Sequence, residues 1–495
     1  MPAGGPRDSG GGGQEALLAA LRACLGDAGV LDHPEDLRPF ECDGLSMLRE
    51  LPLCVVLPGS REEVQDVLRL CAAHGAAVVP RGAGTGLSGG ARPVSGAVLL
   101  NLARMRRMEP VDRENASVRL EPGVRNLAIS EAARPLGFYY APDPSSQIAC
   151  TIGGNVAENS GGVHCLKYGL TVHNLLALDV VTAGGEFLRL GEGSLDQPGY
   201  DLLALLTGSE GLLGVIAGCT VRLLPLPEAR AVLLATFAGV EEAARAVGEI
   251  LAAGVIPAGL EMMDHFAIGA AEDFVQAGYP RDAGALLLCE LDGTAAELAE
   301  QQAEVVRVLE TCGAVHLRIA EDAATQAQLW KGRKAAFPAV GRISPDYYCM
   351  DGSIPRRKLG AVLREIALCS QQYGLRVANV FHAGDGNLHP LILYDASQPG
   401  ERDRAEQFGQ RILELCVAAG GSVTGEHGVG VEKLDGMCVQ FTADELAQLH
   451  AIRAAFDPGG RLNPGKAVPS LHRCAELGAM HVHQGALPFP EMERY

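Results

Sequence analysis

Hydrophobic and polar positions in the N-terminal part of the chain alternate between strand-like runs and helical spacing. Residues 53–57 form a short apolar run that is typical of a buried strand. Ser60 and Glu63 then stand at the spacing of a capping box, and apolar residues recur with helical spacing over residues 64–71. Residues 76–79 predict the next strand, so this region predicts an α/β unit.

The same alternation of strand-like runs and helical spacing returns later in the chain. Residues 231–237 and 285–291 predict strands, whereas residues 241–253 and 295–309 have helical spacing. A chain of 495 residues is too long for one hydrophobic core, so we expect two or three domains.

A hairpin is predicted around Asp385-Gly386, which lies between the apolar runs 375–380 and 391–394. An Asp-Gly pair is the strongest short-range signal for a two-residue hairpin turn. A turn at this pair would place His382 directly opposite His389, with their Cβ atoms roughly 5 Å apart on one face. Two imidazole nitrogens could then reach one metal ion at about 2.0–2.1 Å each.

A third ligand is available in the segment Gly425-Glu426-His427-Gly428. Adjacent side chains of an extended segment point in opposite directions, so we assign Glu426 to the ion and His427 to a substrate proton. The alternative is a plain cross-strand histidine pair with Glu426 capping a turn, but four such residues in two glycine-rich loops favour a site. Two histidines and a carboxylate suit zinc, manganese or ferrous iron alike.

Three tracts of small residues, 80–90, 142–162 and 208–216, predict a site for an extended ligand. Backbone N–H groups without obstructing side chains can bind a pyrophosphate. No helical pattern follows the first tract, so the strand-to-helix context of a Rossmann site is missing, and a glycine-rich loop can also be a plain turn. A dinucleotide is the natural candidate for a ligand that lines all three tracts.

The net charge of −19 argues against a nucleic-acid or anionic-membrane partner. No apolar run approaches the roughly 20 residues of a membrane span, and the glycine-rich start lacks the apolar region of a signal peptide. We therefore expect a cytoplasmic protein with a disordered tail at residues 1–14. None of the 14 cysteines stands at C-x₂-C or C-x₄-C spacing, so the chain should hold no iron–sulfur cluster of its own.

Five motifs together resemble the FAD-linked oxidases of the vanillyl-alcohol oxidase, or PCMH, type. In chain order these are Pro-Arg-Gly-x-Gly-Thr-Gly-Leu-Ser-Gly-Gly, Thr-Ile-Gly-Gly-Asn, Gly-Ser-Glu-Gly, His-Ala-Gly-Asp-Gly-Asn-Leu-His and Gly-Glu-His-Gly. Within this family the chain resembles, over residues 15–495, the catalytic flavoprotein subunits of bacterial glycolate oxidases.

The resemblance implies an α+β fold. It comprises a PCMH-type FAD-binding domain of two α/β subdomains (15–227), a cap domain built on an antiparallel sheet (228–440) and a C-terminal segment (441–495) that returns to the flavin. Thr85 stands where relatives with covalent flavin carry a histidine, so we expect non-covalent FAD. The residues expected to bind FAD are Arg81, Gly82, Gly84, Thr85, Gly86, Leu87, Ser88, Pro142, Ser145, Thr151, Gly153, Gly154, Asn155, Asn159, Gly161, Glu210, Gly211, Gly214, Ile216 and Asn463.

The resemblance also implies the chemistry. Trp330–Phe337 is helix-compatible and by composition could be a solvated helix face, but relatives bind the substrate carboxylate through the arginine that matches Arg333. Relatives acting on D-2-hydroxyglutarate carry a lysine where this chain has Cys349, so a short monocarboxylate is expected. The implied reaction is FAD-dependent oxidation of a 2-hydroxy acid, glycolate to glyoxylate, in which the metal acidifies the C2 hydroxyl, His427 removes its proton and C2 passes a hydride to the flavin.

D-lactate remains an alternative substrate, because one methyl group is worth only about 1–3 kcal/mol in a pocket. A metallohydrolase and a non-catalytic flavin-binding subunit are the competing classes. The resemblance further implies a hetero-oligomer with an iron–sulfur subunit and a second FAD-binding subunit, peripheral to the inner face of the cell membrane.

Overall fold

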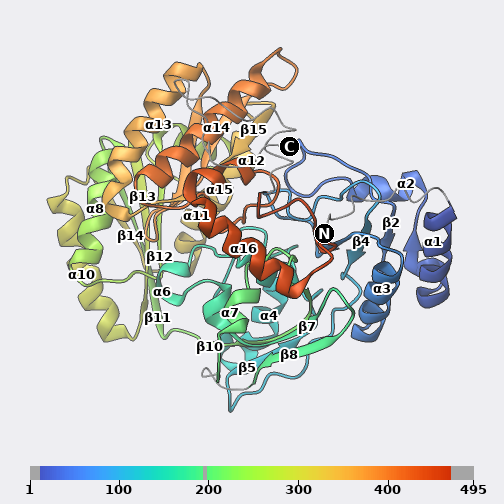
Figure 1. Ribbon diagram of the computed structural model, residues 1–495. Coiled ribbons are helices and arrows are strands. Elements are labelled where there is room, and N and C mark those ends of the chain that lie inside the picture. The colour runs from blue at the N-terminus through green and yellow to red at the C-terminus, as the bar shows by residue number, and fades with distance from the viewer. Residues whose placement is uncertain (1–11, 193–197, 470–495) are drawn as a thin grey trace.

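The computed structural model describes residues 12–192 and 198–469, which form two lobes (Figure 1). One lobe holds two four-stranded sheets from the first half of the chain, and the other holds a nine-stranded sheet from the second half. Helix α1 begins at Gly12, so the predicted disorder of residues 12–14 is wrong; the rest of the predicted tail lies outside the described residues. Within the described part of the chain, no helix combines the length and the apolar character needed to cross a membrane.

The first subdomain has the strand order β1-β2-β4-β3, in which β2, β4 and β3 run parallel. The strands predicted at 53–57 and 76–79 and the helix after Ser60 are confirmed. Ser60 Oγ accepts from the Glu63 N–H at 3.2 Å, but the Glu63 carboxylate accepts from the N–H of Gly59 rather than of Ser60. The elements are α1 (Gly12–Leu25), β1 (Val30–Leu31), α2 (Pro34–Leu37), β2 (Cys54–Val56), α3 (Arg61–Ala73), β3 (Val78–Arg81) and β4 (Val98–Asn101).

The second subdomain is an antiparallel sheet of order β5-β9-β7-β8, with a small β6–β10 ladder beside it. Part of the tract of small residues at 142–162 is helical, because α5 spans Ile152–Glu158. The remaining elements are β5 (Ser117–Leu120), α4 (Asn126–Ala133), β6 (Phe138–Tyr139), α6 (Cys165–Tyr168), β7 (Leu175–Val181), β8 (Phe187–Gly191), α7 (Leu202–Leu206), β9 (Val215–Arg222) and β10 (Leu224–Pro225).

The cap lobe is built on the antiparallel sheet β14-β11-β13-β12-β17-β18-β16, with β15 and β19 joined beside β17. Its strands are β11 (Ala229–Phe237), β12 (Gly259–Asp264), β13 (Ala285–Gly293), β14 (His316–Ala320), β15 (Asp346–Cys349), β16 (Gly352–Ser353), β17 (Val377–His382), β18 (Asn387–Leu388) and β19 (Pro390–Tyr394). Its helices, with those that follow it, are α8 (Val240–Ala252), α9 (His265–Val275), α10 (Ala295–Thr311), α11 (Ala323–Lys334), α12 (Ala336–Val340), α13 (Leu359–Tyr373), α14 (Glu401–Ala418), α15 (Leu434–Gln440) and α16 (Ala443–Phe456).

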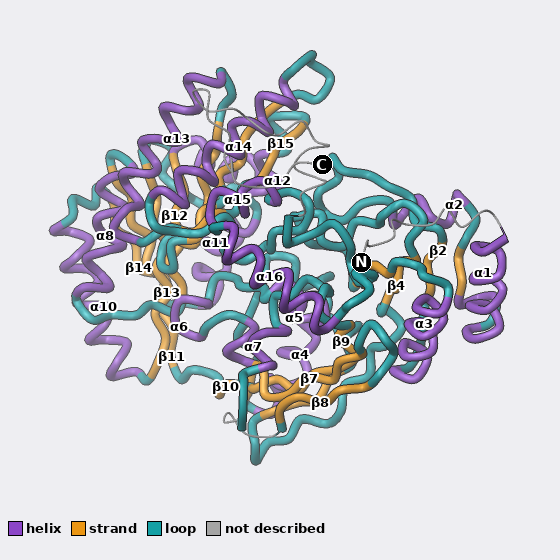
Figure 2. The backbone as a smooth tube through the Cα atoms, in the orientation of Figure 1, coloured by secondary structure: helices purple, strands orange, loops and turns teal. Residues whose placement is uncertain are grey.

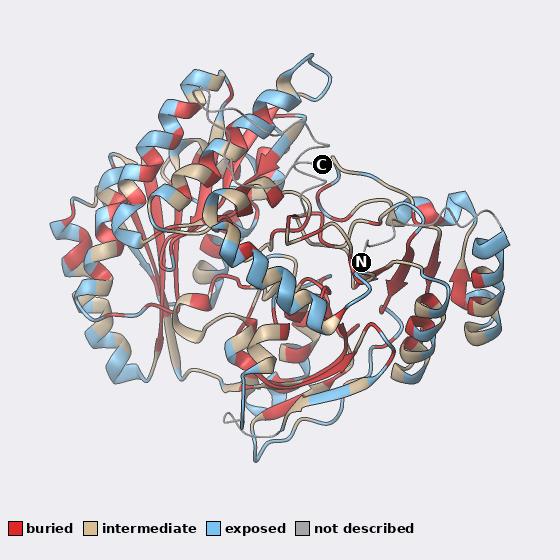
Figure 3. Ribbon diagram, in the orientation of Figure 1, coloured by how far each residue is buried: buried red, intermediate tan, exposed pale blue. Residues whose placement is uncertain are grey.

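Both faces of the cap sheet are covered, which explains the unbroken apolar runs in its strands. In β11, Leu233 and Phe237 pack into the core beneath α8, α10, α13 and α14, whereas Val232 and Leu234 pack into the core beneath α9, α11 and α12. Strands β11, β12 and β13 are accordingly almost entirely buried, whereas the edge strand β14 and the outer faces of the helices are exposed (Figure 3).

The histidine hairpin forms, but its predicted register is wrong. His382 pairs with Asn387 and Asn379 pairs with Pro390, so the turn spans the four residues 383–386 rather than Asp385-Gly386 alone. The Gly386 N–H donates to the His382 carbonyl at 3.1 Å and closes this longer turn. His389 therefore lies diagonally from His382, with ring centroids 5.1 Å apart.

The described part of the C-terminal segment returns to the first lobe, where α16 crosses toward it (Figure 1). Leu462 forms a parallel bridge with Val78 at the edge of β3. The Asn463 side chain donates to the carbonyls of Gly90 and Glu210 at 3.0 and 2.6 Å. The segment thus joins two of the glycine tracts.

Candidate active site

Loops of the two lobes meet near the centre of the molecule (Figure 2). Residues of both lobes line a cavity of about 400 Å³. The cap contributes Arg333, His389, Glu426 and His427 to its wall. The other side is lined by most of the residues predicted to bind FAD: Arg81, Gly82, Gly84, Thr85, Gly86, Leu87, Ser145, Thr151, Gly153, Gly154, Asn155, Glu210, Gly211, Gly214 and Ile216.

The other predicted FAD residues do not line the cavity but stand behind its wall. The Ser88 carbonyl accepts from the N–H of Val431, and the Pro142 carbonyl accepts from the Asn126 side chain. A Cβ on Gly161 would lie 2.5 Å from Glu426 Oε2, so glycine there leaves room for the carboxylate. This supporting group is Ser88, Pro142, Asn159, Gly161 and Asn463.

The wall fits a dinucleotide. A Cβ on Gly82 would lie 2.3 Å from Thr151 Oγ1, and Gly84 has a φ of +72°, so both positions need glycine. Thr151 Oγ1 is buried without a hydrogen-bond partner in the described part of the chain, as expected for a hydroxyl that serves a bound group. Thr85 lines the cavity and offers no imidazole for a covalent flavin link.

The predicted ion ligands lie together on the cap side. Glu426 Oε1 is 3.3 Å from His382 Nε2 and 3.1 Å from His389 Nε2. Donor atoms that share one ion at about 2.0–2.2 Å lie roughly 3 Å or slightly more apart, so this spacing fits a divalent ion. Burial raises the pKa of the Glu426 carboxyl, but the two imidazoles outweigh burial and hold this pKa well below its usual range.

Glu261, which the sequence did not single out, links the ion ligands to Arg333. One carboxylate oxygen lies 2.7 Å from His382 Nδ1, and the other accepts from Nε and Nη2 of Arg333 at 2.8 and 2.7 Å. The contact at Nδ1 leaves the Nε2 lone pair of His382 available to an ion. Glu261 contacts Arg333 through Nε and Nη2, so Nη1 of Arg333 is not used by this carboxylate.

Asp351 organises the loop that carries Glu426 and His427, and it was also missed. Its carboxylate accepts from the N–H groups of Gly425, Glu426 and His427 at 3.0–3.1 Å. It also pairs with Lys433 Nζ at 2.8 Å, and both side chains are fully buried. Only the fold brings these distant positions together, so no local sequence signal identifies Asp351.

The expectation that Glu426 and His427 point in opposite directions is wrong, because both line the cavity. Successive N–H groups that converge on Asp351 curl this loop, and a curled loop does not alternate its side chains as an extended strand does. The His427 ring stacks on that of His389, with centroids 4.9 Å apart and planes 7° apart. Burial is the largest influence on His427 and lowers its pKa to about 4, which favours the neutral ring that a base requires.

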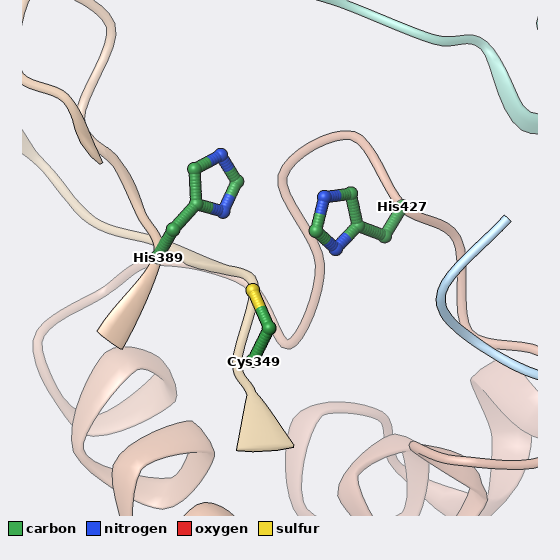
Figure 4. A group of neighbouring side chains, drawn as sticks. All are labelled: Cys349, His389 and His427. Carbon is green, nitrogen blue, oxygen red and sulfur yellow. The ribbon is translucent and has the colours of Figure 1, made fainter. Parts of the chain in front are cut away.

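Helix α11 carries Arg333 into the cavity wall, and Lys334 beside it also lines the cavity. The predicted helix over 330–337 is interrupted at Ala335, where α11 ends and α12 begins. Cys349 at the end of β15 lies next to His389 and His427 (Figure 4). No disulfide joins any two of the cysteines that the structure describes.

Two family matches cover most of the chain. Residues 52–191 match the FAD binding domain, and residues 226–467 match FAD linked oxidases, C-terminal domain. The solved structures of p-cresol methylhydroxylase with substrate bound and of 4-ethylphenol oxidase from Gulosibacter chungangensis share the fold, with TM-scores of 0.77 and 0.78 at 19% and 18% identity. Each comparison covers 94% of this chain and 99% of that one.

The chain belongs to the FAD-linked oxidases of the PCMH type and is an FAD-dependent oxidoreductase. It is 60% identical over 480 residues to "Glycolate oxidase subunit GlcD" of Escherichia coli (strain K12), a match that spans 97% of this chain and 96% of that protein. It is 36% identical to the Bacillus subtilis (strain 168) protein of the same name, over 86% of this chain and 91% of that one. The "D-lactate dehydrogenase" of Anaerostipes hadrus is 33% identical, over 84% and 89%.

Proposed function

We propose that this chain oxidises a short 2-hydroxy acid, with glycolate as substrate and glyoxylate as product. The observation that carries the proposal is one cavity whose wall combines the FAD tracts with Arg333, Glu426 and His427. Support for the substrate class comes from relatives named as glycolate oxidase subunits and as a D-lactate dehydrogenase.

Each of the site residues has a separate role in this reaction. Arg333 binds the substrate carboxylate through the N–H groups that Glu261 leaves free, and His427 accepts the proton of the C2 hydroxyl. His382, His389 and Glu426 hold a divalent ion, zinc, manganese or iron. When bound, FAD supplies a two-electron acceptor, and the ion supplies a positive charge beside the substrate hydroxyl.

Cys349 favours a small substrate. A second carboxylate beside His389 and His427 would find the neutral thiol of Cys349, because burial and nearby acidic groups raise the thiol pKa well above its ordinary value. Burying a carboxylate without a cation costs several kcal/mol. Glycolate and D-lactate lack such a group, whereas D-2-hydroxyglutarate carries one.

The test is the visible spectrum of the purified, FAD-loaded chain under nitrogen, before and after substrate is added. Glycolate should bleach the flavin, D-lactate should follow at a different rate, and D-2-hydroxyglutarate should act poorly. A coloured protein that no 2-hydroxy acid bleaches would reject the proposed substrate class. Preferential bleaching by D-lactate would make the second candidate the function.

We also propose that the electrons leave through partners, in a hetero-oligomer with an iron–sulfur subunit and a second FAD-binding subunit, peripheral to the inner face of the membrane. The word "subunit" in the names of the similar proteins supports an assembly. The reduced chain alone should pass electrons to artificial dyes but reoxidise slowly in air. Stopped-flow mixing with oxygenated buffer tests this, and reoxidation as fast as flavin reduction would show that no partner is needed.

A further inference from the structure

A second set of possible metal ligands lies beside the first. Cys349, His389 and His427 each offer a donor atom, and these atoms lie within 4.8 Å of one another. Figure 4 shows the thiol of Cys349 below the two imidazoles, between the strand and the loop that carry them. His389 is common to both sets, whereas Cys349 and His427 belong only to the second.

Two possible ligand atoms of the second set make no hydrogen bond to the described residues around them. The Nδ1 atoms of His389 and His427 are buried and have no hydrogen-bond partner in the described part of the chain. The nearest acid, Asp351, is 3.9 Å from one and 4.0 Å from the other, beyond hydrogen-bond distance. Buried nitrogens without partners are uncommon in folded proteins and point to a ligand.

The donor chemistry of the two sets differs. His382, His389 and Glu426 offer two nitrogens and a carboxylate, which suit several divalent ions. Cys349 replaces the carboxylate with sulfur, and sulfur with two imidazoles selects a softer ion such as zinc. We infer that Cys349, His389 and His427 form a second, inhibitory site for a thiophilic divalent cation.

An ion at the second site would inhibit the reaction because it binds a group that catalysis needs. Binding releases the thiol proton of Cys349 and occupies a nitrogen lone pair of His427. If His427 is the base, as proposed above, its ring is then fixed on the ion and cannot take the substrate proton. The inhibitory half of this inference rests on the proposed function, whereas the ion site itself does not.

The geometry requires only a local adjustment. Ligands of one zinc ion lie about 3.5 Å apart, and the donor atoms of this cluster all lie within 4.8 Å of one another. The His427 ring makes no side-chain hydrogen bond among the described residues, so rotation about its side-chain bonds can close the gap. Asp351 would keep the backbone of the loop in place, since it binds the N–H of His427 rather than the ring.

The experiment uses the FAD-loaded chain, first equilibrated with manganese and then titrated with zinc. Zinc and manganese contents are measured after dialysis, and zinc X-ray absorption reports the neighbouring atoms. The wild-type protein should bind zinc with a sulfur neighbour at about 2.3 Å. Cys349→Ser should lose this neighbour and weaken zinc binding at least about tenfold, whereas Cys24→Ser, on the distant helix α1, should change neither.

The kinetic arm measures flavin reduction by glycolate at increasing zinc. The zinc concentration that halves the rate should rise at least about tenfold in Cys349→Ser and stay constant in Cys24→Ser. Zinc bound only through nitrogen and oxygen in the wild-type protein would overturn the inference, even if it displaced manganese. If zinc binds through sulfur but glycolate does not reduce the flavin, the zinc site is supported and the proposed function is rejected.

Discussion

Among single residues, His382 tests the ion site most cleanly, because His389 belongs to both ligand sets. His382→Ala should remove the bound ion and most turnover while FAD stays bound, since His382 does not line the cavity that FAD would occupy. Metal analysis and flavin absorbance on the same sample check this. His316→Ala, on the exposed surface of β14, is the control. Full activity in an ion-free His382→Ala protein would reject a role for the ion.

His427 tests the division of labour within the curled loop. His427→Gln should slow flavin reduction by roughly 10²–10⁴, the usual range for a general base, with the content of the manganese or iron site unchanged. Rapid-reaction absorbance with glycolate measures the rate. A parallel loss of that ion would mean that His427, and not only Glu426, is a ligand.

At the scale of elements, the loop 424–427 is held by a buried charge pair. Asp351→Asn would leave Lys433 buried without its carboxylate, which costs about 3–5 kcal/mol of unfolding free energy. It would also loosen the N–H contacts that place Glu426 and His427, so flavin reduction should slow as well. Denaturant unfolding and reduction rates measure the two effects.

The control is the double variant Asp351→Asn/Lys433→Met, which removes both charges of this pair. It should recover part of the lost stability, because removing both partners of a buried pair costs less than removing one. If the double variant loses as much unfolding free energy as the two single variants together, Asp351 and Lys433 do not stabilise each other.

The sequence predicted the elements around the site better than their contacts. The hairpin register is off by two residues, yet both histidines still share a face, because side chains alternate with a period of two along a strand. Motif residues such as Gly82 and Thr151 fall on the cavity wall as expected. Glu261 and Asp351 were missed because their role depends on contacts more than 70 residues away along the chain, which local patterns cannot indicate.

On the scale of the whole molecule, His164 joins the two lobes. Its ring lies 2.9 Å from Asp143 in the tract 142–162 and 3.4 Å from Glu290 in β13 of the cap. Burial lowers the pKa of His164, but the two carboxylates outweigh it and raise the pKa to about 10. A raised folded pKa stabilises the protein fully below the ordinary value near 6.5, and this stability is lost as the pH rises toward about 10.

His164→Gln should therefore lower the melting temperature most at pH 6 and progressively less toward pH 10. Thermal unfolding of both proteins across this range measures the difference, with His74→Gln on the exposed end of α3 as control. A difference that does not change with pH would mean that the charge of His164 contributes nothing.

The return of the C-terminal segment to β3 has a consequence for biosynthesis. A ribosome makes the glycine tracts early, but the side chain of Asn463 that ties Gly90 to Glu210 emerges hundreds of residues later. The bridge from Leu462 to Val78 is equally late. The cavity that we propose for FAD is therefore completed only after nearly all of the chain has been synthesised. We expect cofactor loading to be a late step of maturation, so that nascent chains stalled before these residues would be released without their flavin.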